Sequence, residues 1–82
     1  MINFDSKFTD TIELLQGEWE VKDYQLAGMG WAAVISKGSS LFTLHSERGW
    51  VDIYLGKYQD QNVLACKNTP YGIAEVINSN AT

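Results

Sequence analysis

The side chains able to do nucleophilic or acid–base chemistry are few in this chain. Its 82 residues include a single histidine, His45, and a single cysteine, Cys66. A serine nucleophile needs a base and an orienting acid within hydrogen-bond reach. Ser46, His45 and Asp52 supply those residue types, but Ser46 is expected at a hairpin end without an oxyanion pocket. We therefore expect no catalytic residues, and His45 is interpreted as a packing neighbour of Trp50.

Metal, phosphate and glycosidase chemistry also lack their residue patterns. One histidine and one cysteine do not make the three or four ligands of a zinc site, and Cys66 is expected to point inward as a small apolar residue. Carboxylates at Glu47, Asp52 and Asp60 fall on strands or loop tips, where no deep cleft is expected to raise a pKa. The glycines form neither a phosphate loop nor a dinucleotide fingerprint. The sequence predicts no enzyme activity, no metal and no cofactor.

The charge of the chain is unevenly distributed. Residues 1–23 hold six acids against two lysines, whereas residues 24–82 hold four acids and four bases, for a net charge of −4. Nucleic-acid binding is not expected, because affinity for a phosphate backbone needs clustered Lys and Arg. The N-terminal acids, among them Asp10 and Glu13, are interpreted either as a solvated helix face or as a surface for a basic partner.

Targeting signals are not recognisable in the sequence. The apolar runs are far shorter than the roughly 20 residues that cross a bilayer. The N-terminus carries neither a basic region nor an apolar core typical of a secretory signal. A lone cysteine cannot form an internal disulfide. We expect a cytoplasmic protein without membrane contact, folded as one small domain over residues 1–82.

Two hydrophobic periodicities succeed one another along the chain. A helical stripe over residues 6–16 has an N-cap at Asp5 or Ser6 and a stop at Gly17; its members are Phe4, Phe8, Ile12 and Leu15. From residue 18 the pattern alternates as in a half-buried strand, and further strands are predicted at residues 31–36, 40–46, 50–58 and 62–67.

The short loops between these strands predict an antiparallel meander. Residues 70–78 fit either a short helix after Pro70 or a last strand, and we favour the helix. The predicted fold is α+β. Its N-terminal helix packs on one face of a four- or five-stranded antiparallel meander sheet, and a short C-terminal helix comes last.

The hairpin around residues 46–49 assigns the two faces of the sheet. A four-residue loop there places His45 opposite Trp50 and Thr43 opposite Asp52. The uniformly apolar face is then predicted to point to the core, and it carries Phe42, Leu44, Val51, Ile53 and Leu55. A two- or four-residue turn near Lys37 adds Trp31, Ala33 and Ile35 to this face, whereas a three-residue turn inverts them. A loop at residues 59–62 pairs Leu55 with Cys66.

The opposite face is predicted to be an interaction surface, because Trp and Tyr are enriched at binding hot spots. The candidate partner-binding residues are His45, Trp50, Asp52, Tyr54 and Tyr58 on the sheet and Asp10 and Glu13 on the helix. Alternatively, the sheet curls or the C-terminal segment folds back, and Trp50 and Tyr54 belong to a second small core.

Residues 14–21, Leu-Leu-Gln-Gly-Glu-Trp-Glu-Val, resemble the start of the first strand in lipocalin-like barrels. The chain is too short for the eight strands of that barrel, so this segment is interpreted as a helix stop followed by a buried strand.

Two functional hypotheses remain. The first is a small non-catalytic protein-binding module of the inhibitor, immunity or adaptor type, by analogy with compact acidic proteins of bacteria and phages; its partner is another protein or a second copy in a homodimer. The alternative is a small-ligand-binding domain, or a minimal enzyme, with a pocket between helix and sheet.

Overall fold

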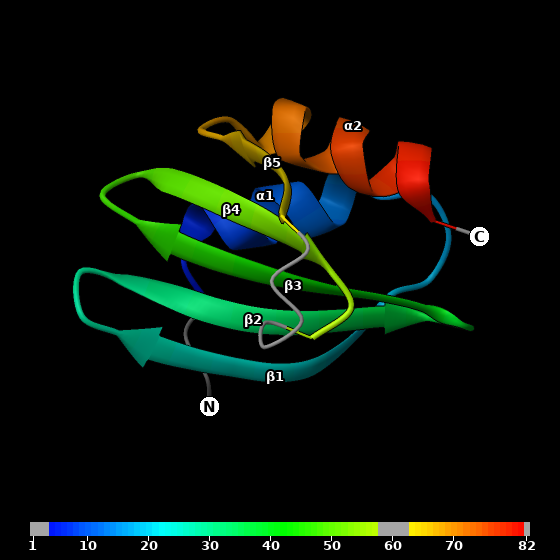
Figure 1. Ribbon diagram of the computed structural model, residues 1–82, viewed down its shortest axis with the longest axis horizontal. Helices are drawn as coiled ribbons and strands as arrows, with labels where there is room; N and C mark the ends of the chain where they lie inside the picture. The colour runs from blue at the N-terminus through cyan, green and yellow to red at the C-terminus, as the bar shows by residue number, and fades with distance from the viewer. Residues whose placement is uncertain (1–3, 58–62, 82) are drawn as a thin grey trace.

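The computed structural model describes residues 4–57 and 63–81. Along these residues a helix, α1, precedes a five-stranded sheet, and a second helix, α2, comes after it. The bounds are α1 Ser6–Leu14, β1 Glu20–Ala27, β2 Gly30–Lys37, β3 Ser40–Glu47, β4 Trp50–Leu55, β5 Val63–Lys67 and α2 Pro70–Asn80. The strands lie in the order β1-β2-β3-β4-β5, and each neighbouring pair is antiparallel (Figure 1). The predicted α+β meander with a C-terminal helix is confirmed.

Helix α1 begins where its N-cap and its apolar stripe predicted it. The side chain of Asp5 accepts a hydrogen bond from the Lys7 N–H at 2.8 Å, as predicted for the N-cap. The predicted stop at Gly17 is wrong, because Leu15 is the C-cap and its backbone is extended. Phe8 and Leu15 are buried. Phe4 is partly exposed, but its ring centre lies 5.2 Å from that of Phe8. The helical stripe therefore faces the core, as predicted, although the helix ends two residues earlier.

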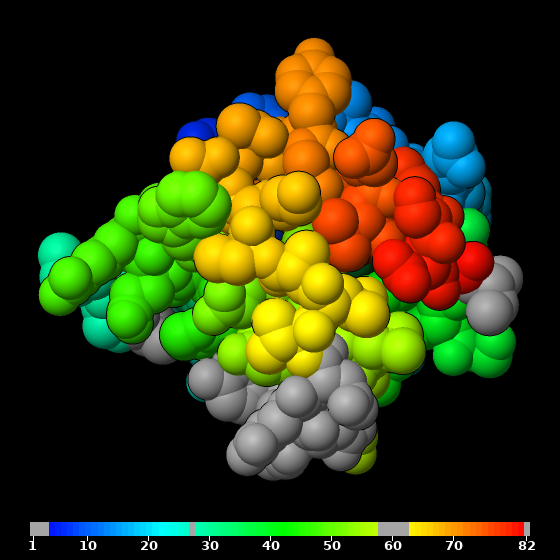
Figure 2. All heavy atoms as spheres, turned by 45° about the horizontal axis from the view of Figure 1, so that its top comes forward, coloured from blue at the N-terminus to red at the C-terminus, as the bar shows by residue number. Residues whose placement is uncertain are grey.

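Both helices cover one side of the sheet, which we call the inner face; the opposite side is the outer face (Figure 1). Helix α2 also lies beside β5 at the surface (Figure 2). Helix and sheet side chains fill the space between them, and those with no exposure are Phe8, Thr11, Ile35, Phe42, Leu44, Val51, Ile53, Ile73 and Ile77. The predicted faces of β3 and β4 are thus confirmed, except that Leu55 at the end of β4 is exposed.

The register of the β3–β4 hairpin differs from the prediction by two residues. The turn contains only Arg48 and Gly49, with φ of 55° and 84°, as in the tight turns whose twist matches paired strands. His45 therefore lies opposite Asp52, and not opposite Trp50 as expected. Because side chains alternate with a period of two, this shift leaves every residue on its predicted face.

Two β-bulges, one in β1 and one in β5, by contrast move the residues that follow them to the opposite face of the sheet. Lys22 is an extra residue between the β1–β2 pairs, so Tyr24 turns to the inner face. Leu64 is the extra residue between the β4–β5 pairs, which places Cys66 opposite Asp52. The prediction that Cys66 points inward is wrong: it lies on the outer face and is exposed.

Candidate functional site

The predicted aromatic surface on the outer face is only partly exposed. Trp50, at the β3–β4 hairpin, is 51% exposed, whereas Tyr54 is only 8% exposed. The expectation of an exposed Tyr54 is therefore wrong, and its burial agrees with the alternative that Tyr54 is enclosed, whereas Trp50 is exposed as the first alternative predicted. Its cross-strand neighbour Thr43 is also buried, and the Thr43 hydroxyl donates to the Gly56 carbonyl at 2.7 Å. The outer face is therefore buried at Thr43 and Tyr54.

Among the described residues, the other predicted sheet residues do not extend the exposed aromatic surface. His45 and Asp52 are half-buried and opposite one another on β3 and β4. Tyr58 lies outside the described residues. In the part of the chain that the structure describes, Trp50 is therefore the predicted aromatic residue that is exposed on the outer face.

Cys66 and Asp52 form a polar pair on the outer face. A side-chain hydrogen bond to Asp52 raises the pKa of the Cys66 thiol, and partial desolvation and the nearby negative charge add to this rise. The protonated thiol is therefore favoured at neutral pH. Because the thiolate is the nucleophile, this environment makes Cys66 less reactive.

A groove between the two helices brings together both predicted acidic residues. We call it the helical groove; it has a volume of about 250 Å³, and its lining residues are Asp10, Glu13, Leu14, Pro70 and Tyr71. Both carboxylates are exposed on α1. Tyr71, in the first turn of α2, is 76% exposed. The groove thus combines an open aromatic ring with apolar and acidic neighbours.

Backbone caps and one bridging side chain position this groove. Thr69 caps α2 by accepting from the Gly72 N–H at 3.1 Å, and Pro70 lies in the first turn. Asn78 reaches from α2 to the end of α1, where it accepts from the Gln16 N–H at 2.9 Å and donates to the Leu14 carbonyl at 3.3 Å. Helix α1 is thereby held against α2.

Sequence reasoning missed Tyr71 and Asn78 as parts of this surface. A signal for Tyr71 was present, because it directly follows Pro70 and lies outside the apolar stripe formed by Ile73, Ala74 and Ile77. Asn78 carries no such signal. Its two partners precede it by 62 and 64 residues, and no local pattern relates them.

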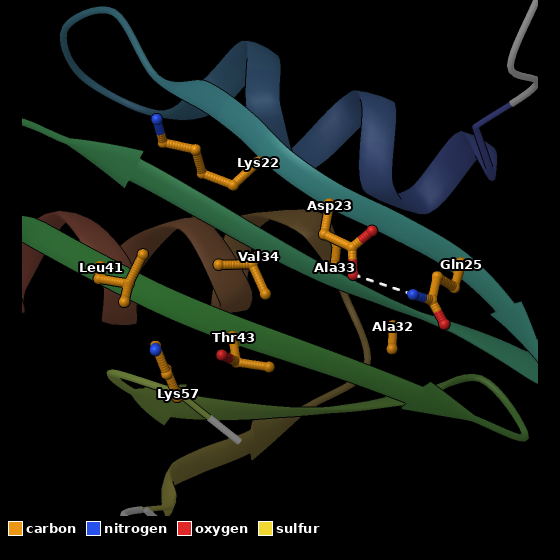
Figure 3. Close-up of a pocket in the computed structure, with 9 residues that line it drawn as sticks. All are labelled: Lys22, Asp23, Gln25, Ala32, Ala33, Val34, Leu41, Thr43 and Lys57. Carbon is orange, nitrogen blue, oxygen red and sulfur yellow. Dashed lines mark hydrogen bonds between the residues drawn. The ribbon is translucent and has the colours of Figure 1, made fainter. Parts of the chain in front are cut away.

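A second concave region, which we call the sheet hollow, lies on the outer face and has a volume of about 420 Å³ (Figure 3). It is lined by Lys22, Asp23, Gln25, Ala32, Ala33, Val34, Leu41, Thr43 and Lys57. Short side chains of β2 and β3 form its floor, and longer polar side chains stand at its rim (Figure 3). This hollow lies on the opposite side of the sheet from the packed inner face.

Comparisons with known proteins give no relatives. No protein-family model matches the chain, no curated protein matches it, and no solved structure matches it. Within residues 4–57 and 63–81, neither helix has the length and apolar character needed to cross a membrane. The same residues contain no group of three or more His, Cys, Asp or Glu side chains placed to hold a metal ion.

Proposed function

We propose that the protein is a small, non-catalytic binding module of the cytoplasm that captures a partner protein in the helical groove. The observation that carries this proposal is Tyr71, which is 76% exposed in a groove that also holds two carboxylates. Tyrosine is among the residue types most enriched at binding hot spots, because it offers a large apolar surface and a polar tip.

The size of the groove favours a protein partner over a small molecule. Its volume of about 250 Å³ falls below the roughly 300–1,000 Å³ typical of small-molecule sites. Leu14 and Pro70 extend the apolar surface beside Tyr71, so a partner side chain can be covered on several sides. A shallow surface with a central aromatic and a polar rim is typical of protein interfaces.

The charge around the groove favours a basic partner segment. Asp10 and Glu13 stand on α1, and Glu75 lies one turn of α2 after Tyr71, so its side chain is on the same side of that helix. Lys67 packs near Gly72 at the start of α2 and offsets part of this charge. The net charge of −4 attracts a basic partner over a longer range.

Selection of random displayed peptides on the purified protein tests this proposal. We expect the enriched peptides to carry Lys or Arg beside an apolar residue. Tyr71→Ala and Glu13→Lys should each weaken their binding about tenfold, the size of a typical interface anchor or close charge pair. Glu18→Lys is the matched control, because it makes the same change of charge at an exposed position outside the groove.

Two outcomes would contradict a site in the helical groove. Peptides that bind Tyr71→Ala as tightly as the parent would show that the aromatic ring is not used. Equal weakening by Glu13→Lys and Glu18→Lys would show that only the overall charge matters.

In a second form of this proposal, the partner in the helical groove is another copy of the same chain. Light scattering on the purified protein distinguishes a homodimer from a monomer that binds a different protein. A monomer has a mass of 9.2 kDa. A dimer that dissociates in Tyr71→Ala would make a second copy the occupant of the groove. A dimer unaffected by that change would place the contact elsewhere.

A further inference from the structure

We propose that the open edge of β1 is a homodimer interface, at which β1 of a second copy of the chain adds as an antiparallel strand. Strand β1 is the first in the sheet order, and within residues 4–57 and 63–81 it pairs with β2 alone (Figure 1). The other edge strand, β5, is shorter and lies beside α2. An open edge is a template for pairing with another strand. This interface is separate from the helical groove, which lies between α1 and α2.

The turn between β1 and β2 determines which main-chain groups face the open edge. Residues 28–29 form a two-residue turn, so the flanking residues Ala27 and Gly30 exchange both of their main-chain hydrogen bonds. Hydrogen-bonded and non-hydrogen-bonded pairs alternate along an antiparallel ladder. Tyr24 and Leu26 belong to the non-hydrogen-bonded pairs. Their N–H and C=O groups therefore point away from β2, toward the open edge.

These edge groups are spaced for pairing with a second copy. When Gln25 lies opposite Gln25 of the second copy, Tyr24 lies opposite Leu26 of that copy. The two-fold symmetry makes this pair twice, and each pair exchanges two main-chain hydrogen bonds. Residues 24–26 carry no charge, and Asp23 lies opposite the uncharged Ala27. No like charges are therefore opposite one another in this register, which would weaken the pairing.

Exposed apolar side chains at the same edge support a second copy as the occupant. Leu26 is 79% exposed, and it is two residues from Tyr24, so both side chains are on the inner face. The ring centres of Phe4 and Tyr24 are 4.7 Å apart, and Phe4 is also partly exposed. In the proposed register, Leu26 of each copy lies beside Tyr24 and Phe4 of the other. The dimer thus covers apolar surface that the monomer leaves open.

The length of the pairing segment limits the strength of this dimer. The bulge at Lys22 ends the regular edge on one side, and the turn ends it on the other. Residues 23–27 remain, whereas a stable interface uses roughly 20–30 residues a side. Two chains with a net charge of −4 also repel each other. We therefore expect a weak dimer that forms at high protein concentration and is strengthened by salt, which screens the repulsion.

Disulfide trapping tests the register directly. In a Cys66→Ser background, Gln25→Cys places two cysteines in a non-hydrogen-bonded pair, where the Cα atoms are about 4.5 Å apart and a disulfide can form. We expect a covalent dimer under mild oxidation with glutathione. Asp23→Cys in the same background is the matched control on the same strand. It is displaced from its own copy by about 13 Å along the strand, so it should remain monomeric.

Sedimentation equilibrium tests the apolar contact. Leu26→Lys should weaken dimer formation at least about tenfold, because each copy loses a buried leucine and gains a charge in the interface. Met29→Lys is the matched control. It makes the same change of charge at a 78% exposed turn position outside the pairing segment. An unchanged circular dichroism spectrum checks the folding of both variants.

Amide hydrogen exchange identifies the edge that pairs. Exchange at Tyr24 and Leu26 should slow as the protein concentration rises, whereas the Gln25 amide, already bonded to β2, should not change.

Three results would overturn the edge dimer. The first is a chain that stays monomeric at about 1 mM, where even weak complexes form. The second is equal disulfide trapping of Gln25→Cys and Asp23→Cys, which would exclude the proposed register. The third is a dimer that dissociates in Tyr71→Ala but persists in Leu26→Lys. That dimer would form through the helical groove, so this proposal would fail while the proposed function stands.

Discussion

Replacing Asn78 by alanine tests how the two helices are held together. The substitution removes both hydrogen bonds by which α2 contacts the end of α1, at 2.9 and 3.3 Å. A typical hydrogen bond contributes about 0.5–1.5 kcal/mol net, and water can reach the exposed Gln16 N–H after the change. We therefore take about 1–2 kcal/mol for the pair. Alanine favours a helix over asparagine by about 0.5 kcal/mol, which offsets part of this loss.

The expected net loss of stability for Asn78→Ala is therefore about 1 kcal/mol, or roughly 4–8 °C in Tm for a domain of this size. Asn80→Ala is the matched control. The Asn80 amide donates to the Val76 carbonyl at 2.7 Å within α2, so its loss affects one helix only. Both substitutions lie in the last turn of α2 and remove a side-chain hydrogen bond, so a greater loss in Asn78→Ala reports the contact between helices.

Urea denaturation followed by circular dichroism measures both free energies of unfolding. We expect Asn78→Ala to unfold at a lower urea concentration than Asn80→Ala, and to bind helical-groove peptides more weakly because α1 is less firmly placed. If the two variants are equally stable, the Asn78 contacts do not hold α1 against α2, and this reasoning is refuted.

Three further variants test other contacts. Gly30→Ala would set its Cβ 1.9 Å from the Ser46 carbonyl oxygen, so we expect a loss of about 2 kcal/mol in urea denaturation, and an unchanged midpoint would contradict this. Asp52→Asn removes the largest cause of the raised pKa of Cys66, so the fraction of thiolate should rise and iodoacetamide should alkylate it faster at mildly alkaline pH; an equal or slower rate would show that the pair does not form. Trp50→Ala should cost less than about 1 kcal/mol, because the side chain is half exposed, and loss of folding would place this ring in a core.

The sequence by itself determined the order of the elements and most of the core. The stripe of Phe8 and Leu15 identified the buried side of α1, and Asp5 caps its start as predicted. Alternation in β3 and β4 identified the inner face even though the turn length was wrong. A register shift of two residues changes which cross-strand residues are paired but keeps each side chain on the same face of the sheet. The prediction of the inner face therefore does not depend on the length of the turn.

Tertiary structure decided where the alternation breaks. The extra residues Lys22 and Leu64 reverse the facing of the strand segments beyond them, which turns Tyr24 inward and Cys66 outward. A bulge adds one residue to one strand, and the partner strand has no residue paired with it. The side-chain pattern of the bulged strand does not show where this extra residue lies. The burial of Tyr54 was likewise decided by tertiary structure, because alternation in β4 assigns a residue to a face without showing whether that face is covered.

The residues of the candidate sites were also found partly from sequence and partly only from tertiary structure. Composition alone identified Asp10 and Glu13 as a candidate acidic surface, because charge can be counted along the chain. Their association with Tyr71 depends on the packing of α2 against α1, which Asn78 supports through partners more than 60 residues away. Local patterns record periodicity and capping, whereas contacts between distant segments form only when the core closes, and those contacts assemble both the helical groove and the sheet hollow.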